Sequence, residues 1–503
     1  MGRLTRRDLL VRAGRGAALL TVVPISRVGV ASAGGSRDPR LRALARAVRG
    51  PVITAASPLY ATARLPFNAR FDDIRPLAIV RPLDAEDVRK IVLWSAHTGV
   101  PIRARSGGHS YAGYSSTRGV VVDLADLNRI AIDPGREAIV GAGTRVIDVY
   151  AALAGHGLSI PAGSCPTVGV AGLTLGGGFG LASRAWGLTC DNLLELEIVI
   201  AGGRKLVCDR RRHSELFWAC RGGGGGNFGI VTRFRFRTHR VGRASYFVVT
   251  WPWSAVDAVV HRFQQWAPHT PVELAALCRL ATGPGAPSVQ VFGQYLGPAS
   301  RLATLLRGLT SGLPPSRVTT GTSDWLDLQL RWAGCLGKTI AQCHPQGLTS
   351  SGTLGRATFA AASDYVTRPI PPRGIATMRR WIERREHGTG SGSILLDAYG
   401  GAVNRVHPGA TAFVHRDALF SCQYLAYWGA SAAARPSLDW LRGLHAAMRP
   451  YVSGFAYQNY IDPTLANWPH AYYGANFRRL VHVKAAYDPH NLFHFAQSIP
   501  THI

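Results

Sequence analysis

The clearest pattern of hydrophobic and polar positions starts near residue 77, where short apolar runs alternate with amphipathic segments. Residues 77–80 are apolar and predict a buried strand. Asp84 then supplies the N-cap of a helix that continues through His97 and stops at Gly99. Residues 101–105 lead directly into a glycine-rich loop. This loop therefore follows a strand end, where ligands are usually bound.

The same alternation continues toward residue 154. Residues 120–124 and 138–142 form short apolar runs that predict two more buried strands. Thr144 is placed to cap a helix that ends near Ala154. Strands that alternate with helices predict a layered fold in this part of the chain.

A hairpin, a helix and a strand are predicted next. Residues 194–201 and 204–208 predict two strands around a Gly-Gly turn, and residues 215–221 predict a short helix. In 231–237 apolar residues alternate with arginines, which predicts a strand with one buried face. Five consecutive glycines at 222–226 have the composition of a flexible linker, but they lie between this helix and this strand.

The middle of the chain, residues 241–455, has a different character. Aromatic residues are scattered among helical and strand-like segments, with apolar runs at 289–295, 394–399 and 419–427. The 503 residues, of which 47% are hydrophobic and 17% charged, are enough for two domains or one large composite domain with a sizeable core.

Charge alters this picture little. The chain has 57 basic and 29 acidic residues, a formal net charge of +28, and only four of the basic residues are lysines. Such a skew is typical of codon bias, and no basic run is interleaved with aromatic residues as in nucleic-acid-binding segments. We therefore interpret the charge as a solvated basic surface and expect no nucleic-acid partner.

The N-terminus predicts export. Residues 5–10 carry a twin-arginine address, 16–26 are uncharged, and 31–33 form a small-residue cleavage site. The uncharged stretch is too short to span a bilayer, so no stable membrane insertion is expected. The sequence thus predicts a signal peptide over residues 1–33 and a secreted, periplasmic or cell-surface protein. A disordered basic tail is the alternative, because three arginines crowd the apolar region.

Candidate chemistry is concentrated in two glycine loops. The first reads Arg105-Ser106-Gly107-Gly108-His109-Ser110, and the second, residues 163–169, leads into a glycine cluster at 176–180. Backbone N–H groups in such loops form concavities suited to a diphosphate. The first loop contains one imidazole, His109, and the second one thiol, Cys165, so a large anionic cofactor could be both cradled and tethered.

These motifs resemble the berberine-bridge-enzyme-like FAD-linked oxidases of the vanillyl-alcohol-oxidase, or PCMH-type, superfamily. The resemblance covers about 77–238 and resumes in Tyr457-Gln458-Asn459-Tyr460 and at 487–491. It implies FAD joined through its 8α carbon to His109 and through C6 to Cys165. With Cys165 so used, seven of the eight cysteines remain. Cys335 and Cys343 are close enough in sequence to bridge, but the connectivity stays open.

The resemblance also implies an α+β fold and a division of the chain. A two-subdomain FAD-binding domain is expected over 72–240 and a substrate domain, an antiparallel sheet covered by helices, over 241–455. Residues 456–503 would return to the FAD domain. The predicted cofactor-binding residues are His109, Cys165, Arg105, Ser106, Gly107, Gly108, Ser110, Gly113, Val168, Gly169, Gly172, Gly176, Gly177, Gly178, Gly226, Gly229, Val231 and Asn459.

Three residues are candidates for catalysis by the same resemblance. Tyr457 would be the base that accepts a substrate hydroxyl proton, which requires its pKa to be lowered from about 10. Gln423 matches a position that supports this tyrosine, and Asp397 matches a polar position on the substrate sheet. Alternatively, Tyr457 only packs against the flavin and Asp397 is a strand-end carboxylate.

Some positions depart from the family pattern. Leu173 stands where many members have a histidine, Trp186 where some have a tyrosine, and Ser421 where some have a lysine. Proton handling is therefore expected to differ. Gly163 is a small residue at a position that the family associates with oxygen access.

The function expected from the resemblance is oxidation of an alcohol or amine carbon in a small or glycosylated molecule, with oxygen as acceptor and hydrogen peroxide as product. A dehydrogenase, an oxidative cyclase of secondary metabolism and a non-catalytic flavin-binding protein are the alternatives. We expect a monomer. The sequence has no nicotinamide fingerprint, Walker loop or zinc-ligand spacing, so no metal site is predicted.

Overall fold

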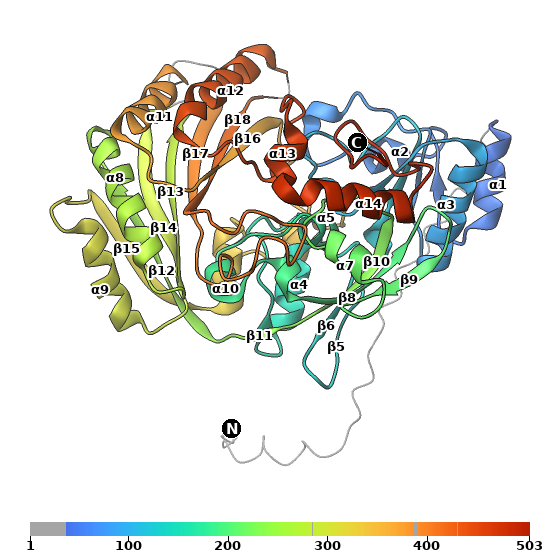
Figure 1. Cartoon of the computed structure of the whole chain (residues 1–503), viewed down its shortest axis with the longest axis horizontal. Helices are drawn as coiled ribbons and strands as arrows, with labels where there is room; N and C mark the ends of the chain where they lie inside the picture. Colours follow the sequence, from blue (N-terminus) through green and yellow to red (C-terminus); the bar gives the residue numbers. More distant parts are fainter. Residues whose placement is uncertain (1–36, 284, 386–389, 430, 503) are drawn as a thin grey trace, which may run out of the picture. The chain divides into compact units, whose positions relative to one another are not determined.

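The structure, a computed structural model, describes residues 37–283, 285–385, 390–429 and 431–502. The predicted signal peptide lies outside the described residues. The described residues belong to one unit, Ser32–Ile503, that contains four sheets. In Figure 1 helices cover one side of the seven-stranded sheet, and the four-stranded and five-stranded sheets lie on its other side.

The first sheet has the order β1-β2-β4-β3, with β2, β4 and β3 parallel and β1 antiparallel to β2. Parallel strands require crossover connections, and α3 supplies the one between β2 and β3. The predicted cap is confirmed: the Asp84 carboxylate accepts the N–H of Asp87, and Gly99 ends α3 at φ 70°. The elements are α1 Pro39–Ala47, β1 Val52–Ile53, α2 Tyr60–Ala63, β2 Ala78–Val80, α3 Ala85–Thr98, β3 Ile102–Arg105 and β4 Val120–Asp123.

The second sheet is antiparallel, with the order β5-β6-β10-β8-β9. In β10 the predicted alternation is confirmed, because Phe234 and Phe236 are buried whereas Arg233 is exposed. The predicted cap at Thr144 is wrong: α4 starts after Arg145, and the Thr144 hydroxyl donates to the Gly141 carbonyl. The elements are β5 Ile130–Ile132, β6 Ala138–Gly141, α4 Val146–Ala154, β7 Leu158–Ser159, α5 Val170–Leu175, α6 Ser183–Trp186, β8 Leu193–Val199, β9 Lys205–Cys208, α7 Ser214–Ala219, β10 Ile230–Phe236 and β11 His239–Arg240, which pairs with β7.

The third main sheet is antiparallel throughout, with the order β15-β12-β14-β13-β17-β18-β16. Its apolar face forms one core with α8, α9, α11 and α12 (Figure 1). Its other face carries Phe359, which packs with Phe67 and Tyr111 of the N-terminal half. The elements are β12 Arg243–Trp251, α8 Val256–Trp266, β13 Leu274–Thr282, β14 Ser288–Tyr295, α9 Ala299–Thr310, β15 Arg317–Asp324, α10 Trp325–Trp332, β16 Phe359–Val366, α11 Pro372–Arg385, β17 Ser391–Ala398, β18 Phe420–Tyr427 and α12 Arg435–Met448.

The C-terminal segment contains α13 Trp468–Tyr473 and α14 Phe477–Tyr487 and shares a hydrophobic core with the first two sheets. Lys484 is fully buried there, 2.6 Å from Asp488, and donates to the carbonyls of Asn227 and Phe493. This cation therefore joins the end of the chain to the segment that follows the five glycines.

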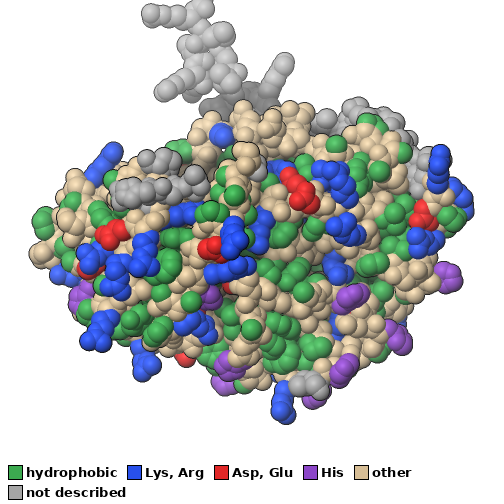
Figure 2. Space-filling view, turned by 90° about the horizontal axis from the view of Figure 1, so that it is seen from above, with side chains coloured by type: hydrophobic (Ala, Val, Ile, Leu, Met, Phe, Trp, Pro, Cys, Tyr) green, Lys and Arg blue, Asp and Glu red, His purple; other side chains and the backbone are tan. Residues whose placement is uncertain are grey.

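These elements confirm the predicted α+β class and the antiparallel, helix-covered sheet. Figure 2 shows basic side chains dispersed over one face among fewer acidic ones. Within the described ranges, no helix is long and apolar enough to cross a membrane, and no group of three His, Cys, Asp or Glu side chains is arranged to hold a metal.

Candidate active site

The two glycine loops lie directly against each other. A Cβ on Gly107 would collide with the backbone nitrogen of Gly169, and a Cβ on Gly169 would collide with the hydroxyl of Ser106. Only glycine allows this approach, because any larger residue would force the loops apart. Two segments about sixty residues apart in sequence thus form one continuous backbone surface.

This surface offers hydrogen-bond donors that the protein does not use. Among the described residues, the backbone N–H groups of residues 107–110 have no acceptor. The buried hydroxyls of Ser115, Ser116 and Thr174 also lack partners. Buried polar groups are rarely left unpaired in folded proteins, so these donors fit a ligand that carries phosphate and ribityl oxygens.

His109 and Cys165 meet at a third residue, Thr167. The Thr167 hydroxyl lies 2.8 Å from His109 Nε2 and 3.8 Å from Cys165 Sγ. The His109 ring stacks on Phe67 with 3.8 Å between ring centroids, and Arg145 donates to the Thr167 carbonyl at 3.0 Å. The sequence analysis missed Thr167 and Arg145, although Thr167 lies inside the second loop motif.

Both nucleophiles are uncharged at neutral pH. Burial, with the positive charge of Arg145, lowers the pKa of His109 to about 3. The Cys165 side chain is exposed, yet surrounding protein atoms desolvate its thiolate and raise its pKa above the ordinary value. An exposed but crowded thiol is expected on the wall of a hollow. The other seven cysteines are buried and free, Cys335 and Cys343 within one hydrophobic cluster.

The C-terminal segment closes the site beside the glycine cluster. Tyr457 Oη accepts the N–H of Gly178 at 2.8 Å and an N–H of Asn459 at 2.9 Å. A Cβ on Gly176 would collide with the Asn459 amide, and Gly177 and Gly178 adopt φ 126° and 83°. The predicted Tyr457 and Asn459 are therefore brought to the cluster from nearly 280 residues away.

The lowered pKa that Tyr457 would need to act as a base is not found. Its two hydrogen-bond donors favour the phenolate, but burial opposes them more strongly and raises the pKa above the ordinary 10. Tyr457 is 2% exposed and remains protonated at neutral pH. This phenol is better suited to donating and positioning than to accepting a proton.

Asp397, in contrast to Tyr457, has a pKa near neutrality. It lies on β17 opposite Ser421 of β18, on the face of the sheet away from the helices. Burial raises its pKa from 3.8 to about 7, so the carboxylate is half ionised near neutrality. A carboxyl group with this pKa is matched to general-base work at physiological pH.

The side chain of Gln423, whose position supports the catalytic tyrosine in related proteins, forms its hydrogen bond with another tyrosine. Its amide donates to the hydroxyl of Tyr111 at 3.0 Å. The Tyr111 ring stacks parallel to Tyr460, with centroids 5.5 Å apart, and burial raises the Tyr111 pKa well above its ordinary value. Gln423 thus orients a tyrosine from the first glycine loop, which sequence spacing could not show.

The remaining predicted cofactor residues form the loops themselves. The Arg105 guanidinium is engaged by Asp123 at 2.8 Å, and the Ser106 hydroxyl donates to the Ala142 carbonyl at 2.6 Å. The Gly222–Gly226 run is not a flexible linker, because Gly222 and Gly224 both donate to the Leu175 carbonyl. In the first loop the Ser110 hydroxyl accepts the N–H of Tyr114, and Gly113 (φ 73°) lies against the Phe71 ring. In the second loop the Val168 carbonyl accepts the N–H of Val146, and Gly172 has no atom within 4 Å of an added Cβ. Gly226 (φ 76°) and Gly229 (φ 158°) precede Val231 of β10.

The divergent positions take structural roles. Leu173 offers its carbonyl to Asn459, and Trp186 stacks on His239 with centroids 4.6 Å apart. The Ser421 hydroxyl is buried without a hydrogen-bond partner in the described part of the chain. It lies directly opposite Asp397 on the neighbouring strand.

Comparison with known proteins supports the interpretation of the two glycine loops as an FAD-binding site. Residues 76–209 match the family model of an FAD binding domain, and 456–500 match the model "Berberine and berberine like". Together with the nucleophiles at the loops, these matches define the chain as an FAD-linked oxidoreductase.

Relatives specify the family. The chain is 34% identical to the FAD-linked oxidoreductase YgaK of Bacillus subtilis over 90% of this chain and 97% of that protein. The structure resembles BBE-like 1 of Physcomitrella patens (TM-score 0.84, 32% identity, 92% and 99% of the chains covered). It also resembles the xylooligosaccharide oxidase of Myceliophthora thermophila in complex with xylobiose (TM-score 0.81, 30% identity, 91% and 98% covered). The chain belongs to the berberine-bridge-enzyme-like family, and the resemblance inferred from its motifs is confirmed.

Proposed function

We propose that the protein is an oxidase with FAD attached through both His109 and Cys165, acting on an alcohol carbon of a saccharide or glycosylated molecule. The observation that carries this proposal is the shared contact of both nucleophiles with the Thr167 hydroxyl. Two tethers to one ring system require two nucleophiles at one place. The saccharide class is supported by the likeness to the xylooligosaccharide oxidase.

FAD held by the two glycine loops would supply the redox chemistry, the oxidation of the substrate carbon with oxygen as acceptor and hydrogen peroxide as product. The chain supplies binding and proton transfer. Asp397, with its pKa of about 7, accepts the proton of the substrate hydroxyl. This assignment replaces Tyr457 as the base, because the pKa of that phenol is raised.

The surrounding groups position the substrate and the cofactor. Tyr457 stays protonated and holds the glycine cluster through Gly178. Tyr111, oriented by Gln423, and the unpaired hydroxyl of Ser421 are available to sugar hydroxyls near Asp397. Oxygen access past Gly163 is proposed from the small size of this residue, since an added Cβ would fill this place, in van der Waals contact with the Phe179 carbonyl oxygen at 3.6 Å.

The test is to precipitate the purified protein with acid and record whether flavin colour and mass stay with the chain. The set comprises the wild type, His109→Ala, Cys165→Ala and the double variant. We expect colour to be released fully only in the double variant. Release of all flavin from the wild type contradicts covalent attachment. Peroxide release with oligosaccharides then tests the oxidase activity, and bleaching without recovery in air indicates a dehydrogenase.

We also propose that the chain is exported by the twin-arginine route as a monomer and that it divides at about residues 72, 241 and 456. Export is supported by the arginine pair in residues 5–10. The division is supported by the two main hydrophobic cores. One is shared by the first two sheets and the C-terminal segment, and the other lies between the seven-stranded sheet and its helices. Fractionation of expressing cells and light scattering of the purified protein test the export and the monomer.

A further inference from the structure

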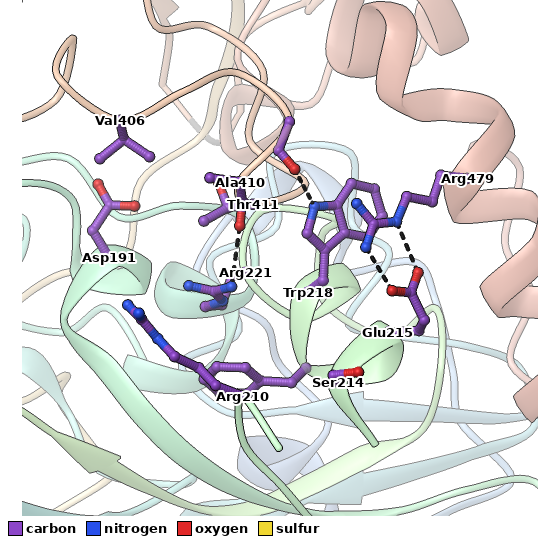
Figure 3. Close-up of a pocket in the computed structure, with 12 residues that line it drawn as sticks. Asp191, Arg210, Ser214, Glu215, Trp218, Arg221, Val406, Ala410, Thr411 and Arg479 are labelled. Carbon is purple, nitrogen blue, oxygen red and sulfur yellow. Dashed lines mark hydrogen bonds and ion pairs between the residues drawn. The ribbon is translucent and has the colours of Figure 1, made fainter. Parts of the chain in front are cut away.

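A pocket of about 410 Å³ lies outside the proposed flavin site. It is formed by α7, the segment around 406–411 and α14 (Figure 3). The Trp218 indole forms part of its wall and donates to the Gly409 carbonyl at 2.8 Å. None of the residues proposed for FAD attachment or catalysis lines it.

The charges that line this pocket do not balance. Asp191 is neutralised by Arg416, whose guanidinium donates to both carboxylate oxygens at 2.7 and 2.8 Å. Glu215 is neutralised by Arg479 at 2.6 Å. Arg210 and Arg221 remain, and within the described chain neither has a carboxylate oxygen within 4.0 Å. The pocket therefore holds two uncompensated positive charges.

Arg221 is the more informative of these two cations. Its side chain is 9% exposed, and it stacks on the Phe217 ring at 4.6 Å. One guanidinium nitrogen donates to the Ala410 carbonyl at 3.1 Å, whereas Nε has no hydrogen-bond partner among the described residues. Burial is the largest influence on its pKa and lowers it, and the unpartnered Nε shows that this buried cation is undersatisfied.

Such a cation is costly unless an anion or further hydrogen bonds accompany it. Guanidinium groups recognise oxyanions through paired N–H donors. Figure 3 shows Arg221 in the middle of the lining, with Arg210 on one side and Trp218 on the other. An oxyanion in this pocket would lie against a lining that contains both guanidinium groups, neither of which has a carboxylate partner among the described residues.

We propose that this pocket binds a doubly charged oxyanion, the phosphate group of a small molecule or free phosphate. Two uncompensated positive charges match one such group. The volume of about 410 Å³ exceeds what a phosphate ion fills, so the pocket leaves room for the rest of a small phosphate monoester. The site is separate from the oxidation chemistry and does not depend on it.

The test is titration calorimetry of the flavin-loaded protein with inorganic phosphate and with glucose 6-phosphate, at constant ionic strength set with potassium chloride. The variants are Arg221→Gln and Arg210→Gln. Each removes charge-assisted hydrogen bonds, so we expect the dissociation constant to rise at least tenfold in each. Tighter binding of glucose 6-phosphate than of phosphate identifies a monoester site, and equal binding identifies a site for free phosphate.

The matched control is Arg211→Gln, which removes an exposed arginine next to Arg210 that does not line the pocket. Its affinity is expected to equal that of the wild type. Arg210 is itself exposed, so its variant is expected to fold even if Arg221→Gln does not. The proposal is wrong if neither anion binds more tightly than chloride, or if Arg210→Gln binds as tightly as the control.

Discussion

Replacing Asp397 by asparagine tests the assignment of the base most directly. The change keeps the shape of the side chain and removes its ionisation. Asp397 is 4% exposed, and its pKa is raised from 3.8 to about 7 by burial alone. The unfolded chain therefore loses this proton near pH 4, whereas the folded chain keeps it until about pH 7.

The sign and size of the stability effect follow from this difference. Each pKa unit corresponds to about 1.4 kcal/mol, so the ionised carboxylate costs the folded state about 4 kcal/mol above pH 7. At pH 5 the cost is about 2 kcal/mol, because the shift is only partly expressed there. Asp397→Asn removes the cost. We expect it to stabilise the fold, and to do so by about 2 kcal/mol more at pH 8 than at pH 5.

Urea unfolding at pH 5, 6, 7 and 8 measures this difference. Asp364→Asn is the control: Asp364 is also fully buried in the same sheet, but it is paired with Arg449 at 3.1 Å and His445 at 3.2 Å. Its replacement is expected to destabilise the fold. A gain in Asp397→Asn that does not grow with pH would refute the reasoning. In activity assays, kcat/KM of the wild type should rise with pH up to about 7, and kcat of the variant should fall by roughly 10²- to 10⁴-fold.

Three further predictions concern the glycine loops, the buried tyrosine and the buried lysine. Gly169→Ala pushes a Cβ into the facing loop and should abolish flavin loading, measured by absorbance; Gly242→Ala, outside the predicted site and with nothing within 4 Å of its Cβ, should load normally. Tyr457→Phe leaves buried donors unpaired and should cost about 1–3 kcal/mol of stability without moving the activity profile between pH 6 and 8, since the Tyr457 pKa lies far higher. Lys484→Met leaves the buried carboxylate of Asp488 unpaired and should lower stability by about 3–5 kcal/mol in urea unfolding; an effect below 1 kcal/mol would contradict the burial of this pair.

Part of the site could be predicted because its signals are local. Glycine is required wherever the backbone takes positive φ or two backbones touch, so the loops around Gly107 and Gly177 are visible as clusters of glycine in the sequence. The cap at Asp84 and the alternation in β10 are equally local, since each depends on residues a few positions apart. Motif order then identified the family, and with it the two candidate nucleophiles.

Other features depend on contacts between distant segments. Gln423 reaches Tyr111 across 312 positions, and its partner is decided by the register of β18 in its sheet and by how that sheet packs on the first loop. The raised pKa of Asp397 likewise depends on burial by neighbouring elements, which no pattern around position 397 encodes.

The sequence by itself therefore determined where the backbone turns, which faces are buried and which family the chain belongs to, because these depend on residue type and short-range spacing. Only the tertiary structure decided that His109 and Cys165 share Thr167, that burial raises the pKa of both Asp397 and Tyr457, and that Arg210 and Arg221 have no carboxylate partner among the described residues. The physical reason is that desolvation and charge pairing are set by every atom within a few ångströms, and packing brings those atoms from all parts of the chain.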